Sequence, residues 1–128
     1  MAVVVKEIRE VQVDEALLQQ LSPEEEACTI IHCSLDVEFF TGIRIWPTTY
    51  LVQEDGSRRK LIKAFQISLY PNWLLIYGPH RFTLVFEGLG KDCRRFDLLE
   101  DIPEPGGFHV PGINRNNTDV YHLFIEET

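Results

Sequence analysis

Apolar and polar residues alternate with a period of two along most of this 128-residue chain. Phe82, Leu84 and Phe86 share one face of an extended segment, and Phe96 and Leu98 resume the pattern after a glycine-bearing turn. Such alternation is typical of β-strands that bury one face in a core. We therefore expect an all-β fold. The predicted core side chains are Phe82, Leu84, Phe86, Phe96, Leu98, Leu123 and Ile125.

Turn-forming residues separate about eight such segments at short intervals, a spacing typical of a β-sandwich. The pair Asp55-Gly56 lies between two β-prone runs and is a strong hairpin signal. No repeat or linker divides the chain, and a chain of this length can bury one sizeable core. The pattern predicts a single domain over residues 1–128 with the fold of an antiparallel immunoglobulin-like β-sandwich.

The N-terminal quarter departs from simple alternation. Apolar positions change faces midway along residues 3–13, which indicates a bulge or a strand that crosses between sheets. Residues 14–26 carry the only helical signals, with Asp14 as a capping residue and a short stripe of leucines behind it. We expect one short helical segment here.

Composition narrows the partners and the compartment. The formal net charge of −8 argues against nucleic acid or an anionic membrane as a partner. No apolar run reaches membrane-spanning length, and the first residues do not form a signal peptide. Three cysteines, an odd number, fit reduced thiols in the cytoplasm. A longer natural precursor would instead place the protein among exported ones.

Residues with chemical potential are present but do not form a recognisable site. His32 and Cys33 stand beside Asp36, yet neighbours on a strand face opposite ways and cannot act as a dyad. Four histidines and three cysteines lack the spacing of a zinc site, and His122 is expected to face outward because its parity is opposite to that of Tyr121. We expect no catalytic, cofactor-binding or metal-binding residues, and hence no cofactor.

Carboxylates also suggest a site that the sequence does not support. Glu87, Glu100 and Asp101 could be imagined as a glycosidase pair. Carboxylates at strand ends are common, however, and no aromatic-lined cleft can be inferred from the sequence, so we do not assign this activity.

Edge strands are the expected sites of partner contact, because their unpaired amides and carbonyls can accept another chain. Pro47 interrupts a β-prone run where a central strand would not tolerate it, and residues 3–13 have the features of a peripheral strand. We expect an unknown protein partner, or a second copy in a homodimer, to use such an edge. The candidate interaction surface is Trp46, Pro47, Trp73, Val5 and Val11.

Several short motifs follow one another up to residue 113: I-x-I-x-P-x-T-Y-L, A-x-x-I, F-x-L-x-F-x-x-L, D-L-x-E and a closing F with G-I. The residues that form them are Ile43, Ile45, Pro47, Thr49, Tyr50, Leu51, Ala64, Ile67, Phe82, Leu84, Phe86, Leu89, Asp97, Leu98, Glu100, Phe108, Gly112 and Ile113. Together they resemble small immunoglobulin-like β-sandwich domains of Bacteroidetes, most of them uncharacterised. The resemblance implies a fold and a frequent place in exported proteins, and it implies no activity.

The sequence thus favours a non-catalytic protein-interaction or accessory module. One alternative is a carbohydrate- or ligand-binding module that uses Trp46, Trp73 and Tyr77. The other is a small hydrolase or metal-dependent enzyme that uses His32, Cys33 or another histidine from a loop.

Overall fold

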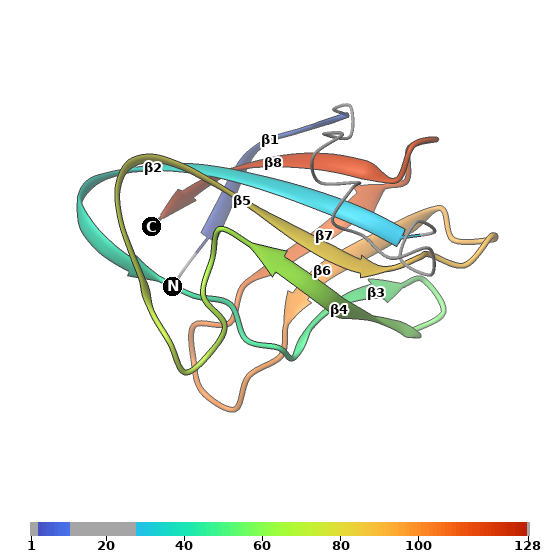
Figure 1. The fold of residues 1–128 in the computed structure, drawn as a ribbon. Coiled ribbons are helices and arrows are strands. Elements are labelled where there is room, and N and C mark those ends of the chain that lie inside the picture. Colours follow the sequence, from blue (N-terminus) through green and yellow to red (C-terminus); the bar gives the residue numbers. More distant parts are fainter. Residues whose placement is uncertain (1–2, 11–27, 128) are drawn as a thin grey trace.

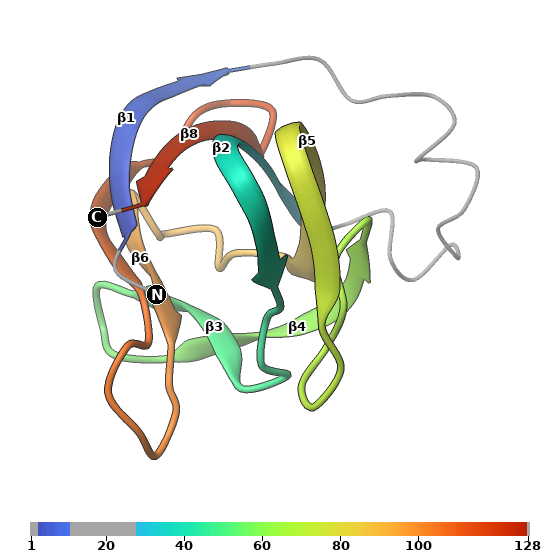
Figure 2. The same cartoon turned by 90° about the vertical axis from the view of Figure 1, so that its left-hand side faces the viewer.

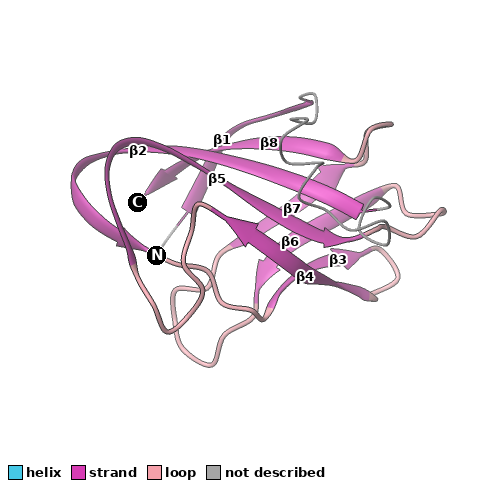
Figure 3. Ribbon diagram, in the orientation of Figure 1, coloured by secondary structure: helices cyan, strands magenta, loops and turns pink. Residues whose placement is uncertain are grey.

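The structure, a computed structural model, describes residues 3–10 and 28–127, which form eight strands and no helix (Figures 1 and 3). No helix of these residues is therefore long and apolar enough to cross a membrane. The predicted helical segment at residues 14–26 lies outside the described residues. The strands are β1 (Val3–Glu10), β2 (Cys28–Ile43), β3 (Thr49–Gln53), β4 (Arg58–Phe65), β5 (Leu74–Glu87), β6 (Arg95–Glu100), β7 (His109–Asn114) and β8 (Val120–Glu127).

The eight strands form one hydrogen-bonded sheet in the order β1-β8-β2-β5-β4-β3-β6-β7. The sheet curls strongly, so that its two end strands approach each other and Cα atoms of β1 and β7 come within 8 Å (Figure 2). β4 makes the bend possible, because residues 58–60 pair with β3 and residues 61–65 pair with β5. The fold is all-β, as predicted, but two separate sheets of an immunoglobulin-like sandwich are not confirmed.

The prediction of an antiparallel sheet is wrong for one pair of strands. β8 runs parallel to β2, with Ile30 opposite Val120 and Leu35 opposite Ile125. The chain leaves β7 at one end of the sheet and enters β8 near the other end, and this crossing lets β8 run in the same direction as β2. Alternation along a strand reports which side chains are buried but does not report strand direction.

The core lies inside the curl of the sheet. Six of the seven predicted core side chains are buried, with exposed fractions of 6% or less, and Ile125 is half-buried at the margin. Phe96 and Tyr121 meet edge to face with ring centroids 5.1 Å apart. The two faces of the strands therefore follow the alternation of the sequence over most of the chain.

The predicted hairpin at Asp55-Gly56 joins β3 to β4. The Asp55 carboxylate accepts a hydrogen bond from the backbone N–H of Ser57 at 2.9 Å, and Gly56 has a φ of +85°. A left-handed residue at this position is what the turn demands, and glycine adopts it without strain. The hairpin confirms the sequence signal.

β1, predicted as a peripheral strand, forms one end of the sheet and pairs only with β8 among the described strands. Its pairing shifts between Val5 and Glu7, which marks a bulge. Val5 lies opposite Ile125, whereas Val11 lies outside the described residues.

β2 and β5 are the longest strands, and they extend beyond their neighbours. Pairing of β2 with β8 ends at Leu35, and pairing of β5 with β4 begins only at Thr83. Residues 36–43 of β2 and residues 74–82 of β5 therefore continue as a two-stranded ribbon, which arches away from the rest of the sheet (Figure 1). We call this part of the structure the β2–β5 ribbon.

Candidate functional site

Large apolar side chains are exposed along the β2–β5 ribbon and at its base. Five of them have exposed fractions above 60%, although most of the other aromatic side chains of the described residues are buried or half-buried. Scattered exposed apolar residues are normal, but a contiguous group of them marks an interaction site. The five are Phe39 (77%), Phe40 (72%), Leu75 (66%), Tyr77 (62%) and Trp73 (61%).

A bulge in β2 brings the two phenylalanines to the surface. Between the pairs Val37–Gly78 and Thr41–Ile76, β2 has residues 38–40 where β5 has only Tyr77. The Thr41 hydroxyl donates a hydrogen bond to the carbonyl of Phe39 at 2.8 Å and so stabilises the bulge. The ring of Phe40 then lies beside that of Tyr77, with centroids 5.0 Å apart. Bulges commonly re-aim side chains next to functional sites.

The base of the ribbon continues this aromatic surface. Gly42 leaves room for Trp73, since a Cβ at that position would lie 3.3 Å from Cε3 of the indole. The Arg44 guanidinium carbon lies 3.8 Å from the centroid of the Trp73 ring and 4.7 Å from that of Tyr70. Tyr70 in turn stacks on Trp46, with centroids 3.7 Å apart and planes 20° from parallel.

These side chains form two connected groups, which together we call the aromatic stripe. Phe40 contacts Tyr77, and a second series of ring–ring and cation–π contacts joins Trp73, Arg44, Tyr70 and Trp46. Leu75 lies between Tyr77 and Trp73 in the sequence, and these three alternate residues are all exposed on the outer face of the ribbon. Arginine over aromatic rings is favourable, more so where water is excluded. The stripe consists of Phe40, Tyr77, Leu75, Trp73, Arg44, Tyr70 and Trp46.

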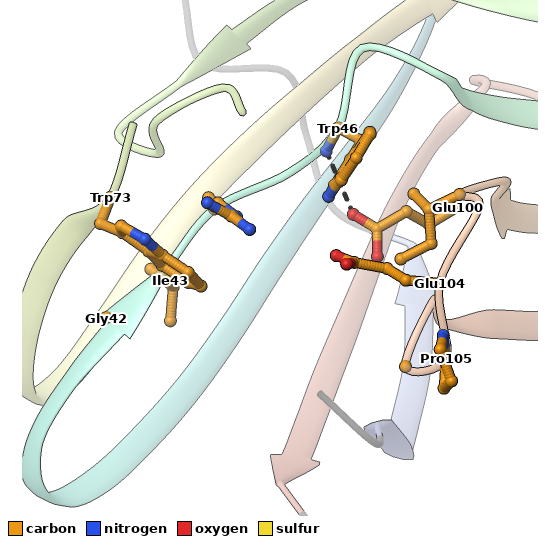
Figure 4. Close-up of a pocket in the computed structure, with 10 residues that line it drawn as sticks. Gly42, Ile43, Trp46, Trp73, Glu100, Glu104 and Pro105 are labelled. Atoms are coloured by element: carbon orange, nitrogen blue, oxygen red, sulfur yellow. Dashed lines mark hydrogen bonds between the residues drawn. The ribbon is translucent and has the colours of Figure 1, made fainter. Parts of the chain in front are cut away.

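A small pocket adjoins the Trp46 end of the stripe. Glu100 at the end of β6 is 8% exposed, and its carboxylate accepts a hydrogen bond from the backbone N–H of Trp46 at 3.1 Å (Figure 4). Burial raises the pKa of this carboxyl, and the hydrogen bonds it accepts oppose that rise only in part. Glu104 lies beside it, with its carboxylate on the same side of Trp46 (Figure 4).

The size of this pocket limits what it can hold. Its free volume is about 100 Å³, whereas pockets for small organic ligands span roughly 300–1,000 Å³. It can receive one side chain or a few atoms of a larger ligand. The pocket therefore extends the stripe and is not a separate ligand site.

The structure brings together part of the predicted interaction surface. Trp46 and Trp73 belong to the same stripe, and Pro47 is exposed next to Trp46. Val5 is elsewhere, since β8 and β2 lie between β1 and β5 in the sheet. Sequence reasoning missed Phe39, Phe40, Leu75, Arg44 and Tyr70. A signal was available in Phe39-Phe40, because two adjacent aromatic residues on a regular strand face opposite ways.

The histidines form local contacts, and one differs from its prediction. His122 is 2% exposed, so the prediction that it faces outward into solvent is wrong. Its ring stacks on Phe124 at 4.4 Å, and its Nε2 lies 2.7 Å from Oγ of Ser34. His122 does lie on the face opposite Tyr121, as parity requires, but neighbouring side chains cover that face. His32 lies on the same outer surface, with Nδ1 2.8 Å from the Thr83 hydroxyl.

No group of three or more His, Cys, Asp or Glu side chains that could hold a metal ion exists in the part of the chain that the structure describes. His109 pairs with Asp97 at 2.9 Å, and His80 Nε2 donates to the carbonyl of Gln66 at 2.7 Å. The cysteines are free thiols, of which Cys33 and Cys93 are buried. Burial raises the pKa of the Cys33 thiol far above its ordinary value, which keeps it in the unreactive protonated form.

Comparison with known proteins adds no relationship: no family model, no curated protein and no solved structure matches this chain. The resemblance to immunoglobulin-like domains of Bacteroidetes stays a prediction from the sequence.

Proposed function

We propose that this protein is a non-catalytic interaction module that binds a protein partner through the aromatic stripe. One observation carries the proposal: the stripe places large apolar side chains in solvent, next to one another, on the outer face of a ribbon whose inner face packs in the core. Interfaces are enriched in Tyr, Trp, Phe and Arg, which are the residue types of the stripe. Monomeric proteins rarely expose such a group without a partner.

The shape of the site supports a protein partner over a small substrate. The ribbon is a raised surface, and the adjoining pocket is shallow and small. Enzymes need a concave site with convergent polar groups. Glu100, the carboxylate with a raised pKa in that pocket, already accepts the backbone N–H of Trp46 and so has a structural role.

A carbohydrate-binding module is the second candidate. It is favoured by the exposed Trp73 indole, since a flat aromatic ring is a surface on which a sugar can stack. Against it, Arg44 lies over the Trp73 ring, and Tyr70 stacks on Trp46, so these faces are partly occupied. Titration of the tryptophan fluorescence with a panel of oligosaccharides separates the candidates, because only the second predicts saturable quenching.

The proposal keeps the immunoglobulin-like relationship as a prediction that rests on the sequence motifs alone. The fold implied by that resemblance does not carry a function, so the proposal rests on the aromatic stripe.

The experiment begins with a photo-crosslinking amino acid placed at Tyr77 and, as a control, at the exposed Lys91 in the turn after β5. The protein is made in its own cells and irradiated, and proteins crosslinked only from position 77 are purified. Calorimetry then measures their binding to the wild type, to the double variant Phe40→Ala/Tyr77→Ala, and to Lys91→Ala. We expect the double variant to bind at least about tenfold more weakly, and Lys91→Ala to bind as the wild type does. Equal binding of all three proteins would refute the proposal.

A further inference from the structure

We infer that the free edge of β2 binds an extended segment of the partner as an added strand, and that this segment is basic and apolar in composition. The inference rests on the proposed function and specifies the chemistry of the partner. It concerns the edge of the β2–β5 ribbon, whereas the aromatic stripe lies on the face of that ribbon.

Among the described residues, this edge is unpaired because β8 leaves β2 after Leu35. β8 pairs with β2 from Ile30 to Leu35; its last residues, Glu126 and Glu127, pair with β1 only, while β2 continues to Ile43. Within the described part of the chain, residues 36–37 and 41–43 pair with β5 on one side and with no strand on the other, and the bulge at residues 38–40 lies between them. Unpaired edges of this kind are templates on which another chain can add a strand.

The backbone of Asp36 faces this open side. The N–H of Ile30 donates to the carbonyl of Asp119, just before β8, at 2.9 Å. Backbone groups on a strand alternate in direction, so every second residue after Ile30 points its N–H and C=O the same way. Asp36 belongs to this series and lies immediately beyond the last β2–β8 pair. An added strand would therefore continue the track of β8.

An open, shallow groove runs along the edge, with residues of β2 on one side and Ile125 and Glu126 at the end of β8 on the other. It offers a surface on which the side chains of an extended peptide can lie, not an enclosed cavity. The lining residues from β2 are Asp36, Val37, Glu38, Phe39 and Thr41.

The charges of the groove select the occupant. Among the described side chains, Asp36, Glu38 and Glu126 line the groove and no basic one does, and neither Asp36 nor Glu38 has an ion pair within this part of the chain. The exposed Phe39 adds an apolar contact. An extended peptide with lysine or arginine beside apolar residues complements this lining, since opposite charges across an interface favour association and fix its register.

A second copy of this chain fits less well. If two β2 edges paired antiparallel about Val37, Asp36 of each copy would lie opposite Glu38 of the other. Like charges directly opposite each other in a sheet are destabilising. The net charge of −8 on each copy adds to the repulsion.

A library of random ten-residue peptides, displayed on phage and selected against the whole protein, tests the inference. We expect the enriched peptides to alternate apolar residues with Lys or Arg and to lack internal proline. A synthetic peptide of the consensus sequence should bind Asp36→Lys and Glu38→Lys about tenfold more weakly than the wild type. Asp92→Lys is the matched control, because it makes the same charge change in a distant exposed turn and should leave binding unchanged.

Two further measurements identify strand addition. Methylating every second backbone nitrogen of the peptide should abolish binding when the methylated nitrogens are those that face β2. Methylating the other nitrogens should leave binding unchanged. Amide exchange followed by NMR should slow at Asp36 when the wild-type protein binds the peptide. The inference is overturned by acidic or proline-rich consensus peptides, by the absence of any enrichment, by equal binding to Asp36→Lys and Asp92→Lys, or by dimerisation through this edge. The proposed function would survive each of these results if Phe40→Ala/Tyr77→Ala still weakened binding of the natural partner.

Discussion

The same substitution, phenylalanine to alanine, should have very different effects at two positions of this sheet. Phe86 on β5 is fully buried in the core, whereas Phe40 on β2 is 72% exposed. If the aromatic stripe serves binding and not folding, truncating Phe40 must leave the protein almost as stable as the wild type. Truncating Phe86 must instead destabilise the protein strongly.

The structure sets the magnitudes. Removing a fully buried phenylalanine ring costs about 3–5 kcal/mol of unfolding free energy, through lost burial and the cavity left behind. Phe40 buries only about a quarter of its surface, so its share of the roughly 1.5–3 kcal/mol for a fully buried side chain is below about 0.8 kcal/mol. Its contact with Tyr77, with centroids 5.0 Å apart, is open to water and adds a few tenths. The expected loss for Phe40→Ala is about 1 kcal/mol or less.

Urea unfolding followed by tryptophan fluorescence measures both variants. With a slope of about 1.5 kcal/mol/M, Phe86→Ala should lower the midpoint by about 2–3 M and Phe40→Ala by less than about 0.7 M. Leu84→Ala, also fully buried, is a second core control and should cost about 2–5 kcal/mol. A loss above about 2 kcal/mol for Phe40→Ala would show that the stripe supports the fold, and the reasoning from exposure would fail.

Three other predictions follow from the site and the core. Burial raises the pKa of Glu100 in the folded state. The contribution of Glu100 to stability is therefore greatest below the ordinary carboxyl value of 4.5 and falls as the pH rises through the raised pKa. Glu100→Gln should flatten this fall when unfolding is measured against pH, and an unchanged pH profile would contradict the prediction. Cys33 should resist thiol reagents in the native protein and react only on unfolding, whereas the half-buried Cys28 should react first. Mass spectrometry of alkylated peptides measures both reactions, and rapid labelling of Cys33 in the native protein would be inconsistent with its burial. In Trp46→Phe, the remaining Trp73 should be strongly quenched by acrylamide and protected when the partner binds, whereas weak quenching without the partner would mean that its indole is covered.

The sequence predicts the strands and the core well because side-chain alternation is a local property that burial imposes directly. Phe82, Phe96 and Leu98 are buried as their parity requires, and the Asp55-Gly56 turn forms its hairpin. Strand direction is a different matter. The parallel pairing of β8 with β2 depends on where a distant strand enters the sheet, and no local pattern contains that information.

The site was predictable only in part. Trp46 and Trp73 are 27 positions apart by residue number, and their common contact with the Arg44–Tyr70 pair depends on how the loop before β5 folds back. Phe40 and Tyr77 meet because β2 has extra residues opposite Tyr77, and bulges leave only a weak trace in sequence. For His122, parity predicts the correct face of the sheet but does not predict that the ring of Phe124 packs on it and covers it.

Amide hydrogen exchange of the protein, free and bound to the partner captured from position 77, tests whether the aromatic stripe is the binding surface. We predict that exchange slows in peptides covering residues 36–43 and 73–78, which contain most of the ribbon and the exposed rings of Phe40, Trp73 and Tyr77. Exchange in the β3–β4 hairpin, over residues 54–58, should not change. Protection confined to that hairpin or to β6 and β7, with none in the ribbon, would contradict the claim that the aromatic stripe is the binding surface.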